Sequence, residues 1–243
     1  MNYLLLIAGA LAGGLSAFLL PGNAGARYKL ALVFSGAYLF AITVTHILPG
    51  LFTHPAANGT MTGVLILAGF FAQQLLEYMS QGVEHGHIHI HKEGHAHLAS
   101  SAFWVLLALS LHALMEGGML TGAGTTEGIP GALMAGVLMH KIPEAFALVS
   151  VLSCELSRRR ALLLLVLFSL ASPLGLWLTT LLSGEGLLNG VVLQGLFAFM
   201  CGGFLHISTT IVFESSADHH FNAKKLAVAI LGSAAAVAAE LFI

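Results

Sequence analysis

Charged side chains are scarce along this chain. Asp, Glu, Lys and Arg make up 8% of its 243 residues, whereas hydrophobic residues make up 57%, and the mean hydropathy is +0.90. A soluble domain typically carries about 25% charged residues. The composition therefore excludes an ordinary soluble domain, and we expect a protein whose surroundings are a lipid bilayer, with no nucleic-acid partner.

Cysteine and several functional motifs are also scarce or absent. The two cysteines, Cys154 and Cys201, both lie in apolar runs, where they are predicted to pack as small side chains and not to form a disulfide. No P-loop and no aspartyl-phosphate domain is recognisable, so ATP drive is not encoded, and no organic cofactor is expected. The first 20 residues lack a positively charged leader, which favours a first membrane span over a cleaved signal peptide.

Apolar runs of about 20 residues recur along the whole chain, and each is long enough to cross a bilayer. Backbone amides in lipid must be satisfied within the segment, and the alternating pattern of a membrane barrel is absent, so the spans are predicted to be helices. We expect an all-α polytopic protein, with residues 1–243 forming one transmembrane domain. Its eight predicted spans are about Tyr3–Leu20, Leu30–Phe52, Met61–Ser80, Ser101–Leu120, Ile129–Ser153, Ala161–Leu182, Leu187–Phe213 and Lys225–Ile243.

The basic residues segregate to one side of these spans. Eight of the nine lie between spans one and two, three and four, five and six, or seven and eight: Arg27, Lys29, Lys92, Arg158, Arg159, Arg160, Lys224 and Lys225. Since cytoplasmic loops carry the excess of Lys and Arg, these loops are predicted to be cytoplasmic. Both termini are then outside, in a cell membrane (plasma or inner). The ninth basic residue, Lys141, lies within the fifth span.

Two pairs of His and Glu, His112 with Glu116 and His140 with Glu144, lie inside the fourth and fifth spans. Residues four apart share one helix face. At about 1.5 Å of rise per residue, each imidazole lies roughly 16 Å from the membrane edge where its helix begins, near the midplane of a core about 30 Å thick. Because the two helices are antiparallel, both carboxylates lean back toward that plane. The pattern predicts a four-ligand site for zinc, iron(II), manganese or cadmium; the alternative is a set of satisfied polar residues that tie helices together.

Five short motifs, in order, resemble those of the ZIP (ZRT/IRT-like) divalent metal transporters. They are HILPG (46–50), HALMEGG (112–118), HKIPEAFAL (140–148), SLASPLG (169–175) and GGFLHIS (202–208). The resemblance covers nearly the full length, and the loop rich in His between the third and fourth spans is also typical. It implies a ZIP-like bundle of eight helices with outside termini, inward flux of a divalent metal, and ligands at His112, Glu116, His140 and Glu144. It also suggests a homodimer, and a site that reaches each side of the membrane by sliding of one helix group against another.

Three positions depart from the commonest family pattern, in which neighbouring Asn and acidic residues help to hold a second metal ion. Here those positions are Ala113, Lys141 and a sixth span without an acidic residue. We therefore predict a site for one ion, with the ammonium of Lys141 at the position of the second cation, where it offsets the carboxylate charge. The alternatives for Lys141 are snorkelling or an interhelical ion pair.

Other polar residues in the spans are candidates for an ion pathway. His46 either lines the entrance or bonds a neighbouring backbone group, and Glu77 either guides an ion toward the loop that follows or snorkels. His206 and Glu214 are eight residues apart on one helix face, where they either line an exit path or pair structurally.

A predicted cytoplasmic loop, at about residues 82–99, is rich in His and Gly. Its composition favours a flexible segment that collects or senses metal; the alternative is a solvated loop with little effect on transport. Its six histidines are His85, His87, His89, His91, His95 and His97.

The sequence thus predicts a transporter or facilitator, not an enzyme, that moves a divalent transition metal into the cytosol. Zinc is the expected substrate, with cadmium, iron(II) and manganese as alternatives. One competing hypothesis is an intramembrane zinc hydrolase with Glu116 or Glu144 as its base, although HExxH is absent. Another is a metal sensor or buffer built around the loop rich in His.

Overall fold

The structure is a computed structural model that describes residues 2–19, 25–55, 58–80, 82, 98–121, 131–184, 186, 190–214 and 223–242. Within these ranges the chain forms helices and a few turns and contains no strand, which confirms the all-α prediction. The helices are α1 (Asn2–Ser16), α2 (Gly25–Ile42), η2 (Thr43–Ile47), α3 (Leu48–Thr53), α4 (Gly59–Ser80), α5 (Leu98–Met119), α6 (Gly131–Glu155), α7 (Arg158–Ser169), α8 (Ala171–Gly184), α9 (Gly190–Glu214) and α10 (Ala223–Phe242).

Seven helical stretches within the described residues are long and apolar enough to cross a membrane: Tyr28–Thr53, Gly59–Ser80, Ala102–Met119, Gly131–Glu155, Arg158–Gly184, Gly190–Val212 and Ala223–Phe242. They correspond to predicted spans two to eight. The helix in the first predicted span is shorter than the predicted Tyr3–Leu20: α1 has 15 residues, ends at Ser16 and is followed by a turn. Glycine is a poor helix former, so the adjacent Gly13 and Gly14 favour an early end to this helix.

Two of the membrane stretches are interrupted, and each interruption lies just before a proline. A proline removes one helical hydrogen bond and its ring clashes with the carbonyl four residues earlier. Pro49 is four residues after Thr45, which lies in the π-helical turn η2, and Pro173 is four residues after Ser169, where α7 ends. In contrast, α6 continues through Pro143.

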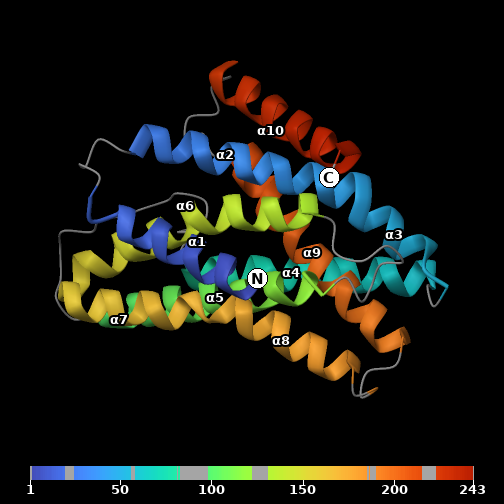
Figure 1. The fold of residues 1–243 in the computed structure, drawn as a ribbon, viewed down its shortest axis with the longest axis horizontal. Helices are drawn as coiled ribbons and strands as arrows, with labels where there is room; N and C mark the ends of the chain where they lie inside the picture. Colours follow the sequence, from blue (N-terminus) through green and yellow to red (C-terminus); the bar gives the residue numbers. More distant parts are fainter. Residues whose placement is uncertain are drawn as a thin grey trace.

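The helices form two sets according to which helices they pack against, and Figure 1 shows α10 lying along α2 at one side of the molecule. In one set α1 packs on α6 and α5 packs on α8, and in the other α4 packs on α9 and α10 packs on α2. The sets contact each other mainly where α2 meets α6 and where α4 meets α5. The two helices that carry the His and Glu pairs, α5 and α6, therefore lie next to the boundary between the sets.

Glycines set the close approach of α4 and α9. A Cβ atom added to Gly69 on α4 would overlap the backbone carbonyl of Phe199, and one added to Gly202 on α9 would overlap the carbonyl of Ile66. Small residues at such crossings let helix backbones touch, which is how helices associate in a bilayer. This pair of helices is therefore held together along its backbones.

Replacing Gly69 by alanine is expected to lower the midpoint of thermal unfolding, because overlap with a rigid backbone atom costs typically about 1–3 kcal/mol. Gly63 on the same helix is a matched control, since a Cβ there meets no atom within 4 Å. Thermal unfolding of the two detergent-solubilised variants provides the measurement. Equal midpoints for Gly69→Ala and Gly63→Ala would contradict the close approach.

Candidate metal centre

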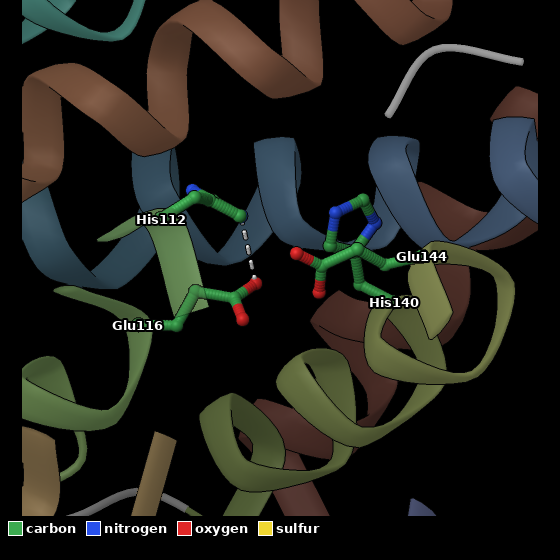
Figure 2. Close-up of side chains that lie close together, drawn as sticks. All are labelled: His112, Glu116, His140 and Glu144. Atoms are coloured by element: carbon green, nitrogen blue, oxygen red, sulfur yellow. Dashed lines mark ion pairs between the residues drawn. The ribbon is translucent and has the colours of Figure 1, made fainter. Parts of the chain in front are cut away.

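Four side chains from α5 and α6 converge at the boundary between the helix sets, and we refer to His112, Glu116, His140 and Glu144 as the His/Glu group. One ligand atom from each of the four lies within 4.8 Å of the others. Figure 2 shows the α5 pair and the α6 pair facing the same space. None of the four residues is more than 2% exposed.

The four ligand atoms lie close to the spacing that a single ion requires. His112 Nε2 lies 3.2 Å from Glu116 Oε1, and the rings of His112 and His140 stand nearly perpendicular, with centroids 6.0 Å apart. A tetrahedral zinc ion with bonds of about 2.0–2.2 Å separates its ligand atoms by roughly 3.3–3.6 Å. The spacings in the group, all within 4.8 Å, exceed this value by at most roughly 1.2–1.5 Å, which side-chain rotations can close.

Lys141 bridges the two carboxylates of the group. Its Nζ contacts Glu116 Oε2 on the neighbouring helix and lies 2.6 Å from Glu144 Oε2 on its own helix. The side chain is buried, and Nζ also lies 5.3 Å from the ring centroid of Phe168 on α7. A buried charge is tolerated only when it is paired, so the ammonium and the carboxylates stabilise one another.

Apolar clusters enclose the His/Glu group on both sides along the helices. Met119 of α5 and Val137 of α6 belong to one cluster, whereas Leu109 of α5 and Leu148 of α6 belong to another. On each helix the His and Glu pair falls between the residues of the two clusters. The arrangement isolates a polar centre in the interior, where an ion would lose its hydration shell and depend on these side chains.

His46 lies away from the His/Glu group, at the contact between η2 and α10. Its Nδ1 is 3.1 Å from Glu240 Oε1, and the hydroxyl of Thr45 donates to Glu240 Oε2 at 2.7 Å. Both partners of the His46–Glu240 pair are partly exposed. Glu240 is the only acidic residue in the eighth predicted span. An ionisable side chain within a span is a candidate for a functional contact, and this was the signal in the sequence that could have indicated a partner for His46.

Glu77 and His206 contact each other across α4 and α9. Glu77 Oε2 lies 2.5 Å from His206 Nε2, and the imidazole also packs edge-on against Phe70. The side chain of Glu214 and the six histidines of the loop, from His85 to His97, lie outside the described residues. No periodicity in the sequence indicated the contact between Glu77 and His206, because the two residues lie 129 positions apart.

The fold and the site define an all-α, polytopic membrane protein with a buried group of two histidines and two glutamates. The family model described as ZIP Zinc transporter matches residues 77–239, which run from the end of α4 to near the end of α10. The chain belongs to the ZIP zinc transporter family, which confirms the resemblance seen in the short motifs.

Curated relatives agree with this assignment. Zinc transporter ZIP9-B from Xenopus laevis is 33% identical over 157 residues, which are 62% of this chain and 51% of the relative. Zinc transporter ZIP1 from Danio rerio is 29% identical over 125 residues (51% and 41%), and protein zntD from Dictyostelium discoideum is 28% identical over 151 residues (58% and 22%). The matched part of the chain thus spans about half the length of these relatives or less.

Proposed function

We propose that this protein is a transporter, not an enzyme, that moves a divalent transition metal, with zinc as the first candidate, into the cytosol. The observation that carries the proposal is the His/Glu group, whose four ligand atoms lie together in the interior between two apolar clusters. Two imidazoles and two carboxylates suit zinc, and they also accept cadmium, iron(II) or manganese. Family membership and the names of the zinc transporter relatives support the same substrate class.

The group binds one ion in this proposal, with Lys141 in place of a second. The ammonium between Glu116 and Glu144 supports this role, because each carboxylate keeps a second oxygen that can face an ion. A dication and an ammonium together outweigh two carboxylates by one positive charge. Neutral imidazole ligands add none, so an ion in the group is held less strongly than it would be without Lys141, which favours its release during transport.

The proposed direction of transport is from the side of the termini toward the loops that carry the basic residues. His46 lies on the outer part of this route, and Glu77, His206 and Glu214 lie on the cytoplasmic part, where the loop rich in His receives the ion. The division of the helices into two sets supports sliding of one set against the other as the movement that opens the site to each side.

Zinc uptake into liposomes tests the proposal. We expect vesicles with the reconstituted wild-type protein to load zinc, and His140→Ala to reduce loading to the level of protein-free vesicles, because one of the four ligands is gone. Ser150→Ala on the same helix is the control, since the hydroxyl of Ser150 donates to the carbonyl of Phe146 in its own helix and lies outside the His/Glu group. Wild-type protein that binds zinc, cadmium, iron(II) and manganese but loads none of them would contradict transport.

A further inference from the structure

A second set of metal-ligand side chains lies between α4 and α9, and we refer to Gln73, Glu77 and His206 as the α4–α9 group. Glu77 Oε2 lies 2.5 Å from His206 Nε2. Gln73 is four residues before Glu77 on the same helix, so both side chains are on one face. The set offers a carboxylate oxygen, an imidazole nitrogen and an amide oxygen.

The surroundings of Gly203 on α9 show where the α4–α9 group lies with respect to the His/Glu group. A Cβ atom on Gly203 would lie 3.7 Å from Gln73 Oε1 and 3.4 Å from the methyl group of Met115. Met115 directly precedes Glu116 on α5, so Gln73 is near the level of the His/Glu group. His206 is three residues beyond Gly203, and α4 ends at Ser80, shortly before the loop rich in His. The three ligands therefore lead from the His/Glu group toward the end of the bundle assigned to the cytoplasm.

Gln73 has an unusual environment for an amide. The residue is 1% exposed, and its Oε1 has no hydrogen-bond partner among the described residues. Buried polar atoms are nearly always satisfied, so a buried acceptor without a donor requires an explanation. A divalent cation would satisfy this oxygen, since carbonyl oxygens are ligands of the harder divalent ions, manganese among them.

A purely structural role would explain the contact between Glu77 and His206 as a tie between helices. These helices are already in backbone contact at Gly69 and Gly202, so packing does not depend on the ion pair. The opposite ends of α4 and α9 are linked by neutral groups, where Gln194 Nε2 donates to Thr62 Oγ1 at 2.9 Å. The side chain of Glu77 is 20% exposed, which gives an ion access to its carboxylate.

We propose that Gln73, Glu77 and His206 form a second binding site for a divalent transition metal, which receives the ion after it leaves the His/Glu group. The inference rests on the proposed transport function. The site has one carboxylate, from Glu77, and Gln73 supplies a neutral oxygen. Three ligands leave room for water, so this site holds its ion less tightly than a closed four-ligand site and passes it on.

Zinc stoichiometry in the detergent-solubilised full chain tests the inference. The six loop histidines, from His85 to His97, are first replaced by serine so that the loop contributes no ions. Equilibrium dialysis against zinc, with metal analysis, should then give two ions per chain, one in each group. Glu77→Gln should leave one ion, because the amide removes the only carboxylate of the α4–α9 group. Thr62→Val, which removes the neutral link at the other end of the same helices, should keep two.

Gln73→Leu separates a ligand from a structural residue without breaking the contact between Glu77 and His206. Loss of even an outer partner of a metal ligand lowers affinity about 10- to 100-fold, so loss of a direct ligand should weaken the second zinc ion at least about tenfold. Unchanged zinc affinity in Gln73→Leu, or two tightly bound ions in Glu77→Gln, overturns the inference. Glu144→Gln reports on the His/Glu group separately, since it should lose the other ion; retention of both ions in that variant would count against the proposed function alone.

Discussion

Replacing Lys141 by methionine is expected to destabilise the metal-free protein by about 3–5 kcal/mol, the usual cost of removing one partner from a buried ion pair. Lys141 is 1% exposed and contacts Glu116 and Glu144, neither of which is exposed. Methionine keeps most of the side-chain volume and the contact with Phe168, so the loss of charge is the main change. The variant leaves two carboxylates close together in an apolar interior, beside the two imidazoles of the His/Glu group.

Thermal unfolding in detergent, with a metal chelator and then with excess zinc, measures this effect. Zinc should recover most of the stability of Lys141→Met, because an ion at about 1,000 times its dissociation constant contributes about 4 kcal/mol. Lys29→Met is the matched control, since Lys29 is exposed on α2 and the same substitution there should change little. A chelated Lys141→Met protein that unfolds at the wild-type midpoint would show that the ammonium does not stabilise the two carboxylates.

Features that depend on a single helix could be predicted from the sequence. The spacing of His112 from Glu116, and of His140 from Glu144, fixes which side chains share a face, because helical geometry is local. The segregation of basic residues fixed the order of the spans, so the antiparallel direction of α5 and α6 followed. These two facts were enough to expect that the four side chains meet, as the structure has them.

Features that depend on contacts between distant helices could not be predicted. The sequence suggests His206 and Glu214 as a pair because both lie on one helix, whereas the structure brings His206 to Glu77 on α4. Nothing in the sequence near either residue encodes that α4 packs on α9; the glycines that allow it, Gly69 and Gly202, are two among 28 in the chain. The bridge from Lys141 to Glu116 also depends on how two helices rotate about their axes.

The π-helical turn and the break between α7 and α8 could be predicted only in part. Each precedes a proline, which the sequence displays, but Pro143 is also inside a membrane helix and α6 continues through it. A proline weakens the helix at each position, and the surrounding packing decides whether the helix bends, widens or ends. The prolines in the sequence therefore indicate where a helix can be interrupted, and the packing around each proline determines whether the helix is interrupted there.

Changing Lys141 to glutamate is expected to raise the number of zinc ions at the His/Glu group from one to two. The substitution replaces the ammonium between Glu116 and Glu144 by a third carboxylate, so the charge of the group changes by two units. One dication can no longer balance three carboxylates, whereas a second ion can share them, as carboxylates do in sites where two metal ions lie about 3.5–4 Å apart.

The number of bound zinc ions per chain is measured in a protein that lacks the loop histidines and carries Glu77→Gln, so that only the His/Glu group contributes bound zinc. X-ray absorption at the zinc edge adds a geometric criterion, because metal–metal scattering at about 3.5–4 Å should be present in Lys141→Glu and absent with Lys141 intact. Lys141→Gln is the matched control: it removes the positive charge without adding a ligand carboxylate, and it should retain one ion. Two ions in the protein with Lys141 intact would contradict the proposal that the ammonium takes the place of a second cation, since that position would then accept metal while the lysine is present.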